Sequence, residues 1–201
     1  MPLFTKEDKS IFFIHIPKAA GTYVENIFLS NGWKIGFFFN DHVQTMPKDP
    51  CTPQHFDYLK LKKYINIDDI PNFVICRNPI DRFKSEMNMF YDYFSNNLEN
   101  NANKILDIYK KDPYVMDNHI RPQNEFIAKN TKIFYFEKDL SNIVSVINNN
   151  FDLGLSGDDI KKFIVLDEKT KIKTKDIVFS KELEKRLQEF YKKDFEYFGY
   201  E

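Results

Sequence analysis

One segment near the start of the chain, residues 10–28, constrains the fold more than any other. It reads SIFFIHIPKAAGTYVENIF, and its apolar first part, rich in β-branched and aromatic residues, predicts a buried strand over residues 10–16. Small residues and Gly21 follow, and apolar residues then recur at helical spacing, which predicts a helix over residues 22–30. A strand that turns into a helix in this way directs several backbone N–H groups at one point, where an anion can bind.

Further segments continue this alternation along the chain. Short apolar runs predict strands over residues 33–39, 73–76 and 132–136. Helical spacing predicts helices over residues 56–64, 80–94, 140–149, 158–163 and 181–195. Residues 119–129 are expected to form a turn that enters a helix, and the polar, Asn-rich residues 99–111 a surface excursion. The pattern predicts an α/β fold with a central, mostly parallel sheet flanked by helices and a site at the carboxyl ends of its strands.

Length and composition exclude several classes of protein. A chain of 201 residues is long enough for one core, so we expect a single domain over residues 1–201. Its 29 Lys and Arg against 30 Asp and Glu argue against a nucleic-acid partner. No apolar leader or run of about 18 apolar residues is seen, so we expect no membrane span and a cytoplasmic location. Cys51 and Cys76 form no metal-binding pattern, so no metal is expected. The oligomeric state is not indicated.

The N-terminal turn carries three groups suited to an anion. Lys18 adds a point charge, Gly21 permits a close approach of the backbone, and the Thr22 hydroxyl can donate a hydrogen bond. The Walker pattern GxxxxGK[ST] is absent because the lysine precedes the glycine, which argues against a standard ATPase or GTPase. On this segment alone, a plain connection between strand and helix remains an equal alternative.

A second segment, residues 73–85, reads FVICRNPIDRFKS and runs from a buried strand into a helix. Arg77 stands at the end of the strand and Ser85 about two turns into the helix, so both can face the expected crevice at the carboxyl ends of the strands. Arginine supplies a planar charged fork and serine a hydroxyl, a pair suited to a terminal phosphate. The alternative for Arg77 is a structural salt bridge.

Five elements together resemble a known family. HIPKAAGT (residues 15–22) and RNPIDRFKS (residues 77–85) resemble the two signature elements of the carbohydrate-type sulfotransferases that use 3′-phosphoadenosine 5′-phosphosulfate (PAPS). HIRPQNEFI, IFYFEKDL and YKKDFEYFGY follow in the family's order, so the resemblance covers nearly the whole chain. It implies a fold like that of the nucleotide kinases and transfer of a sulfuryl group from PAPS to a hydroxyl acceptor, expected to be a carbohydrate, with PAP as product and without a metal.

The resemblance also assigns donor-binding positions. The first element holds the 5′-phosphosulfate, and its positions correspond here to Lys18, Ala19, Ala20, Gly21, Thr22 and Tyr23. The second holds the 3′-phosphate, which corresponds to Arg77 and Ser85. A family loop that closes over the nucleotide corresponds to residues 171–174, with Lys173 and Thr174 as contacts. The family often has KTGGTS or KTAGTS in its first element, so Ala19 and Tyr23 are departures that remove or replace a hydroxyl donor.

Sulfuryl transfer requires in-line geometry, a charge at the leaving oxygen and a base near the acceptor hydroxyl. We assign to Lys18 the role of offsetting the charge that develops on the leaving oxygen. In the branch of the family that sulfates uronic acids, a histidine upstream of the arginine–serine element is the base, and PQHFDYL resembles its surroundings, which selects His55. Its ordinary pKa of about 6.5 suits the task. The alternative is a surface histidine that caps the following helix.

Other residues stay as candidates on the acceptor side. Some branches of the family use a carboxylate as base, so Glu86 and Asp41 are held in reserve. His119 and Arg121 are candidates for contacts with the acceptor, although a buried turn explains them equally well. His15 is expected to be structural.

Two other functions remain open at this stage. A small-molecule or nucleotide kinase would need ATP and magnesium, and the missing Walker glycine argues against it. An inactive nucleotide-binding relative is favoured if His55 lies far from the anion-binding turn.

Overall fold

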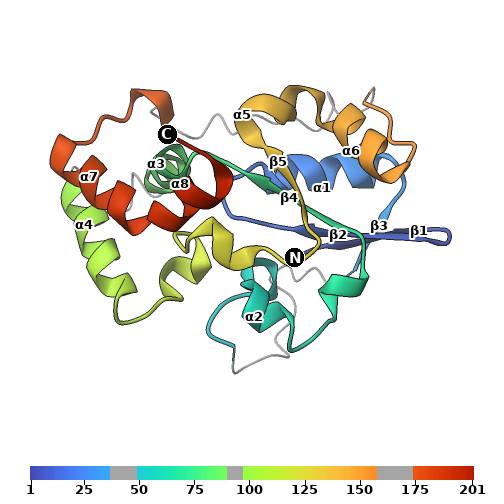
Figure 1. The fold of residues 1–201 in the computed structure, drawn as a ribbon, viewed down its shortest axis with the longest axis horizontal. Coiled ribbons are helices and arrows are strands. Elements are labelled where there is room, and N and C mark those ends of the chain that lie inside the picture. The colour runs from blue at the N-terminus through green and yellow to red at the C-terminus, as the bar shows by residue number, and fades with distance from the viewer. Residues whose placement is uncertain (37–48, 90–96, 158–173) are drawn as a thin grey trace.

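The computed structural model describes residues 1–36, 49–89, 97–157 and 174–201 (Figure 1). Its sheet has the strand order β3-β1-β2-β4-β5. The strands are β1 (Leu3–Lys6), β2 (Lys9–Ile14), β3 (Lys34–Gly36), β4 (Asn72–Cys76) and β5 (Lys132–Tyr135). β2, β4 and β5 are parallel, whereas β1 is antiparallel to both β2 and β3. The predicted α/β class is confirmed, with parallel pairing from β2 through β4 to the edge strand β5 and antiparallel pairing on the β1 and β3 side.

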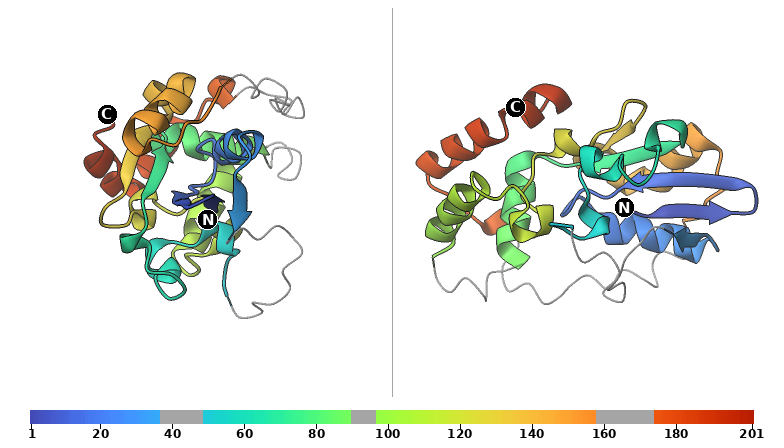
Figure 2. Two further views of the ribbon diagram at one scale, coloured as in Figure 1. Left: turned by 90° about the vertical axis from the view of Figure 1, so that its right-hand side faces the viewer. Right: turned by 90° about the horizontal axis from the view of Figure 1, so that it is seen from below.

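The helices of the described residues lie on both faces of this sheet and beyond one of its ends (Figure 2). The α-helices are α1 (Gly21–Ser30), α2 (Tyr58–Leu61), α3 (Pro79–Met89), α4 (Leu98–Tyr109), α5 (Phe136–Asp139), α6 (Ile143–Phe151), α7 (Lys181–Phe190) and α8 (Lys192–Phe198). The 3-10 helices are η1 (Pro53–His55), η2 (Ile67–Asp69), η3 (Val115–Asn118), η4 (Gln123–Phe126), η5 (Leu140–Asn142) and η7 (Thr174–Asp176). None of these described helices has the length and apolar character of a membrane span.

Buried side chains form three clusters that define the layers. Alternate residues of β2 point to opposite faces, so Phe13 joins the cluster beneath α1 and α6, and Phe12 joins the cluster beneath α2 and η4. Because both faces are covered, the strand is apolar at successive positions. The third cluster joins α3, α4 and α7. Figure 2 shows these helices at one end of the molecule and the β1–β2 hairpin at the other.

The prediction of a surface excursion over residues 99–111 is wrong. This stretch forms most of α4, which buries Ala102, Ile105 and Leu106 at helical spacing. Asn97 caps the helix by accepting a hydrogen bond from the amide of Asn100. The many asparagines and lysines lie on the outer face. They make the segment polar on average, although a narrow apolar stripe of the helix is buried.

Other predicted boundaries need correction. Residues 56–64 contain only the short α2, and residues 119–129 form one 3-10 helix, η4, without an α-helix. The C-terminal helix is broken at Tyr191 into α7 and α8. The strand β1 was not predicted. The predicted helix over residues 158–163 and part of the strand over residues 33–39 lie outside the described residues.

Candidate active site

The connection between β2 and α1 turns through two residues with left-handed backbone conformation. Lys18 has a φ of 65° and Ala20, at the N-cap of α1, a φ of 66°. No side chain caps this helix. Since the first amides of an α-helix have no partner within the helix, the N–H groups that open α1 are directed at the space in front of it, where the helix dipole favours an anion.

Gly21 has a different purpose from the one its position suggests. The left-handed positions of the turn belong to Lys18 and Ala20, and Gly21 itself leaves room for the ring of His15. A Cβ on residue 21 would lie 2.2 Å from Cε1 and 2.3 Å from Nε2 of that ring. The glycine is therefore required by a close side-chain contact.

The other residues of the first motif differ in how deeply they are buried. Ala19 is buried in the cluster beneath α2, and its amide donates to the carbonyl of Ile16 at 3.3 Å. Thr22 is exposed at the start of α1, and Tyr23 is half-buried. The Lys18 ammonium donates to Sδ of Met89 in α3 at 3.3 Å. The lysine thus reaches across to the helix that carries the second motif.

Arg77 follows β4 and ties the two motifs together. Its Nη1 donates to the carbonyl oxygen of Lys18 at 3.2 Å, and its guanidinium lies 4.4 Å from the ring centre of Phe136. Among the described residues no carboxylate forms an ion pair with it, so the salt-bridge alternative gains no support. Burial lowers the pKa of Arg77 from its ordinary value. As the α/β pattern predicts, the two motifs meet at the carboxyl ends of neighbouring parallel strands.

Ser85 is half-buried in α3 and precedes Met89 by one helical turn, so it lies on the helix face that Lys18 touches. Asn78 caps α3, since its Oδ1 accepts from the amides of Ile80 and Asp81. The amide of Asn78 in turn donates to Glu137.

The residues predicted for the nucleotide loop are only partly described. Thr174 begins η7, which packs against α3. Lys173 lies outside the described residues, as do Asp41 and His42.

The remaining motifs support the backbone of Arg77. The amide side chain of Gln123 pairs with the backbone of Arg77, accepting from its N–H at 3.0 Å and donating to its carbonyl at 2.8 Å. Asp194 of α8 accepts hydrogen bonds from the amides of Gln123 and Asn124. Burial raises the pKa of Asp194. The HIRPQ and C-terminal motifs therefore act together to position Arg77.

Three histidines lie in a row beside the turn, each bonded through Nδ1 to a carboxylate from another segment. The pairs are His15 with Glu25 at 2.8 Å, His55 with Asp117 at 2.7 Å and His119 with Glu86 at 2.8 Å. The ring centres of His15 and His55 are 5.4 Å apart, and those of His55 and His119 are 4.5 Å apart. The row thus connects the first motif to the helix that carries the second.

His55 lies in the middle of this row and is 8% exposed. Burial lowers its pKa to about 4, the hydrogen bond to Asp117 opposes this, and the nearby His119 and His15 lower it further. The carboxylate on Nδ1 favours the tautomer whose Nε2 is free to accept a proton. Burial likewise lowers the pKa of His15, whose ring packs on Gly21 and pairs with Glu25, which fits a structural role.

Asp117 was not among the site residues predicted from the sequence. It lies in a run of three left-handed residues, Met116, Asp117 and Asn118, with φ values of 55°, 54° and 65°. Thr52 anchors it, donating from its amide to Oδ1 and from its hydroxyl to Oδ2. Such backbone strain persists only where surrounding contacts enforce it. No local pattern could reveal the pair, because Asp117 and His55 are 62 positions apart.

Two candidates for the acceptor side, Arg121 and Glu86, are buried and form hydrogen bonds within the protein. Arg121 is buried, and its guanidinium donates to Asn118, Glu125 and the carbonyl of Pro113. This arrangement favours a structural role for Arg121. Glu86 is wholly buried in α3 behind His119, which suits an orienting group better than a base in contact with the acceptor.

One nitrogen or oxygen of each of His55, Asp117 and His119 lies within 4.8 Å of the others. However, both Nδ1 atoms are bonded to carboxylates, and both oxygens of Asp117 already accept hydrogen bonds. We therefore treat the cluster as two histidine–carboxylate pairs and assign no metal to it.

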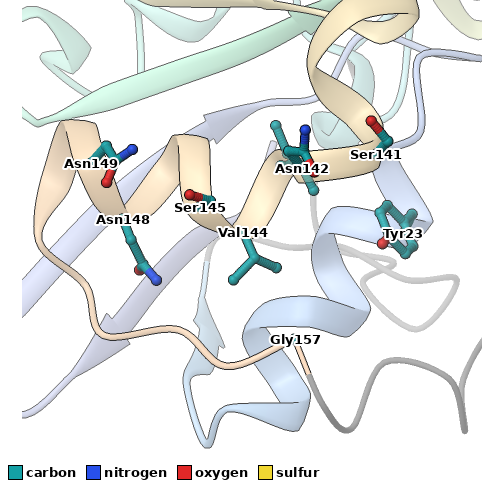
Figure 3. Close-up of a pocket in the computed structure, with 9 residues that line it drawn as sticks. Tyr23, Ser141, Asn142, Val144, Ser145, Asn148, Asn149 and Gly157 are labelled. Carbon is teal, nitrogen blue, oxygen red and sulfur yellow. The ribbon is translucent and has the colours of Figure 1, made fainter.

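A polar pocket opens beside the start of α1. It has a volume of about 500 Å³ and lies between Tyr23 and the segment that leads into and forms α6 (Figure 3). Hydroxyl and amide side chains line it, among them Ser141, Asn142, Ser145 and Asn148. Such groups can hydrogen-bond to the edges of a nucleobase or sugar.

Fold and geometry together define an α/β protein in which the turn between β2 and α1 and the residue after β4 meet at the carboxyl ends of neighbouring parallel strands. The model of the sulfotransferase family matches residues 1–201, and the chain therefore belongs to the sulfotransferase family. This confirms the resemblance stated above and supports sulfuryl transfer in general. Searches of curated proteins and of solved structures found no match.

Proposed function

We propose that residues 1–201 form one sulfotransferase domain that moves a sulfuryl group from PAPS to a hydroxyl of a carbohydrate acceptor. The observation that carries this proposal is the contact of Arg77 with the Lys18 carbonyl, which brings a cationic fork next to the amides that open α1. PAPS has two separate anionic groups, the 5′-phosphosulfate and the 3′-phosphate, and so needs two anion-binding sites. ATP has no 3′-phosphate and would not need the second site. The sulfotransferase family in general uses this donor.

The donor's groups divide between the two motifs. Lys18, Thr22 and the amides at the start of α1 bind the 5′-phosphosulfate, while Arg77 and Ser85 bind the 3′-phosphate. The pocket beside Tyr23 suits the nucleoside, since its volume of about 500 Å³ is within the usual range for small-molecule sites. Ala19 acts as a spacer, because its methyl is buried and its amide is already bonded.

His55 acts on the acceptor side. Nε2 of His55 takes the proton of the acceptor hydroxyl while the oxygen forms a bond to sulfur. The bond between sulfur and the bridging oxygen breaks, and its electron pair leaves on the 5′-phosphate of PAP, where Lys18 offsets the charge. Asp117 holds the imidazole in the tautomer that this step requires.

Isothermal titration calorimetry tests the donor. We expect PAP to bind tightly and ATP with magnesium to give no response. The opposite ranking would support a kinase and contradict the proposal. Tight PAP binding without turnover on any sugar acceptor, measured with labelled PAPS, would instead indicate an inactive nucleotide-binding relative.

A further inference from the structure

Two histidine–carboxylate pairs meet ring against ring in the histidine row. The rings of His55 and His119 are perpendicular, at 89°, with their centres 4.5 Å apart. Behind them, Asp117 and Glu86 bond to the Nδ1 atoms at 2.7 and 2.8 Å. The reaction proposed above uses His55 and Asp117 and leaves the second pair without a role.

Glu86 is the less usual of the two carboxylates. It is wholly buried in α3, and its Oε1 has no hydrogen-bond partner among the described residues. A buried carboxylate with one bare oxygen is costly, so a nearby group that offsets its charge is expected. His119 is bonded to its other oxygen and lies between Glu86 and His55.

The two imidazoles must influence each other's charge, because their ring centres are only 4.5 Å apart and His55 is buried. Burial lowers the pKa of His55 most, Asp117 raises it, and His119 lowers it. Two like charges at this separation disfavour each other strongly, so groups this close titrate as a coupled pair.

We propose that His119, held by Glu86, is a positioning residue for His55, and that the two histidines hold at most one proton between them. A protonated His119 then stops His55 from accepting the proton of the acceptor hydroxyl, whereas a neutral His119 permits it. The inference rests on the proposed function, in which His55 is the base. It assigns the second pair to the control of that base by pH.

Other groups around His55 must be considered in any test. His15 faces it from the turn after β2, with Glu25 of α1 behind, and Cys51 and Thr52 contact it from the preceding residues. The Met1 amino group donates to the carbonyls of Pro53 and Gln54 beside it. These groups are the same in all the variants below. Differences between the variants therefore report on His119 and Asp117 alone.

Nuclear magnetic resonance of the imidazole signals tests the coupling without an acceptor. The chain has four histidines, so single substitutions suffice to assign their signals. In His119→Asn the side-chain amide takes the place of Nδ1 and keeps a bond to Glu86. The titration midpoint of His55 should then move up by roughly one pH unit. In Asp117→Asn the titration midpoint of His55 should move down, and asparagine tolerates the left-handed backbone of this position.

Opposite shifts distinguish coupling from structural damage, which has no reason to move the midpoint in opposite directions. Unchanged thermal melting and PAP binding verify that each variant is folded. A His55 midpoint that does not move in folded His119→Asn would overturn the inference and leave the proposed function intact. If His55→Asn keeps its turnover, the assignment of His55 as base in the proposed function fails, whatever the titrations give.

Discussion

Nη1 of Arg82 donates to the carbonyl oxygen of His119 at 2.7 Å, and Nη2 donates to the carbonyl of Arg121 at the same distance. The arginine is buried to 1% exposure in α3 and holds the HIRPQ segment against that helix. The same segment carries Gln123, which pairs with the backbone of Arg77. One buried guanidinium therefore links α3 to the segment that supports both the histidine row and Arg77.

Arg82→Lys should destabilise the protein by about 1–3 kcal/mol, because an ammonium lacks the fork that reaches both carbonyls and leaves one of them unsatisfied. Urea denaturation measures the change. Arg186→Lys is the matched control, since that half-buried arginine pairs with Asn103 and Asp107 near the surface. Its effect should stay below about 1 kcal/mol. Equal effects of the two substitutions would contradict the assigned role of Arg82.

Gly21→Ala should cost about 1–3 kcal/mol, because the new methyl meets the ring of His15, which is itself held by Glu25. PAP binding should weaken in parallel, since the ring and the turn must shift. Gly36→Ala is the control, because its Cβ would meet only the Leu3 carbonyl, at 3.8 Å. Thermal melting and calorimetry of both variants check this. Wild-type stability in Gly21→Ala would refute the contact.

Ser85→Ala should weaken PAP binding by about 10-fold or more, the usual cost of losing a hydrogen bond to a charged group. Adenosine 5′-monophosphate lacks the 3′-phosphate, so its affinity should be the same for both proteins. Calorimetry with the two nucleotides gives the comparison. A parallel loss for both would mean that Ser85 is not a contact of the 3′-phosphate.

His55→Asn and His55→Ala should both abolish turnover and leave PAP affinity unchanged. Asparagine can keep the bond to Asp117 but cannot replace Nε2, so its loss of activity isolates the base from the packing. Single-turnover assays with labelled PAPS and a panel of sugar acceptors measure this. Near-normal turnover in either variant would end the assignment of His55 as base.

His55 should also make folding stability depend on pH. Burial lowers its pKa to about 4 in the folded chain, from the ordinary 6.5. The unfolded chain therefore binds more protons between these values, and stability is lost as the pH falls through this window. The expected loss from His55 between pH 7 and 5 is about 2 kcal/mol. Urea denaturation at both pH values should give a smaller difference in His55→Asn, and an equal difference would argue against a buried, neutral His55.

Local pattern was sufficient for much of the fold. The strand, turn and helix of residues 10–28 and the strand that leads to Arg77 were predicted in type and nearly in extent, because apolar periodicity and turn residues act within a few positions of the chain. The rule for parallel strands then predicted that Lys18 and Arg77 meet. Composition misled where polar residues were many, as in α4, whose buried stripe is narrow.

By itself, the sequence determined the family, the α/β class and the two motifs that meet at the strand ends. Only the tertiary structure decided what surrounds them. It paired His55 with Asp117 across 62 positions, placed the ring of His15 over Gly21, and buried Arg121 among its own partners. The physical reason is that backbone preference is local, whereas contacts between distant side chains depend on how the whole chain packs.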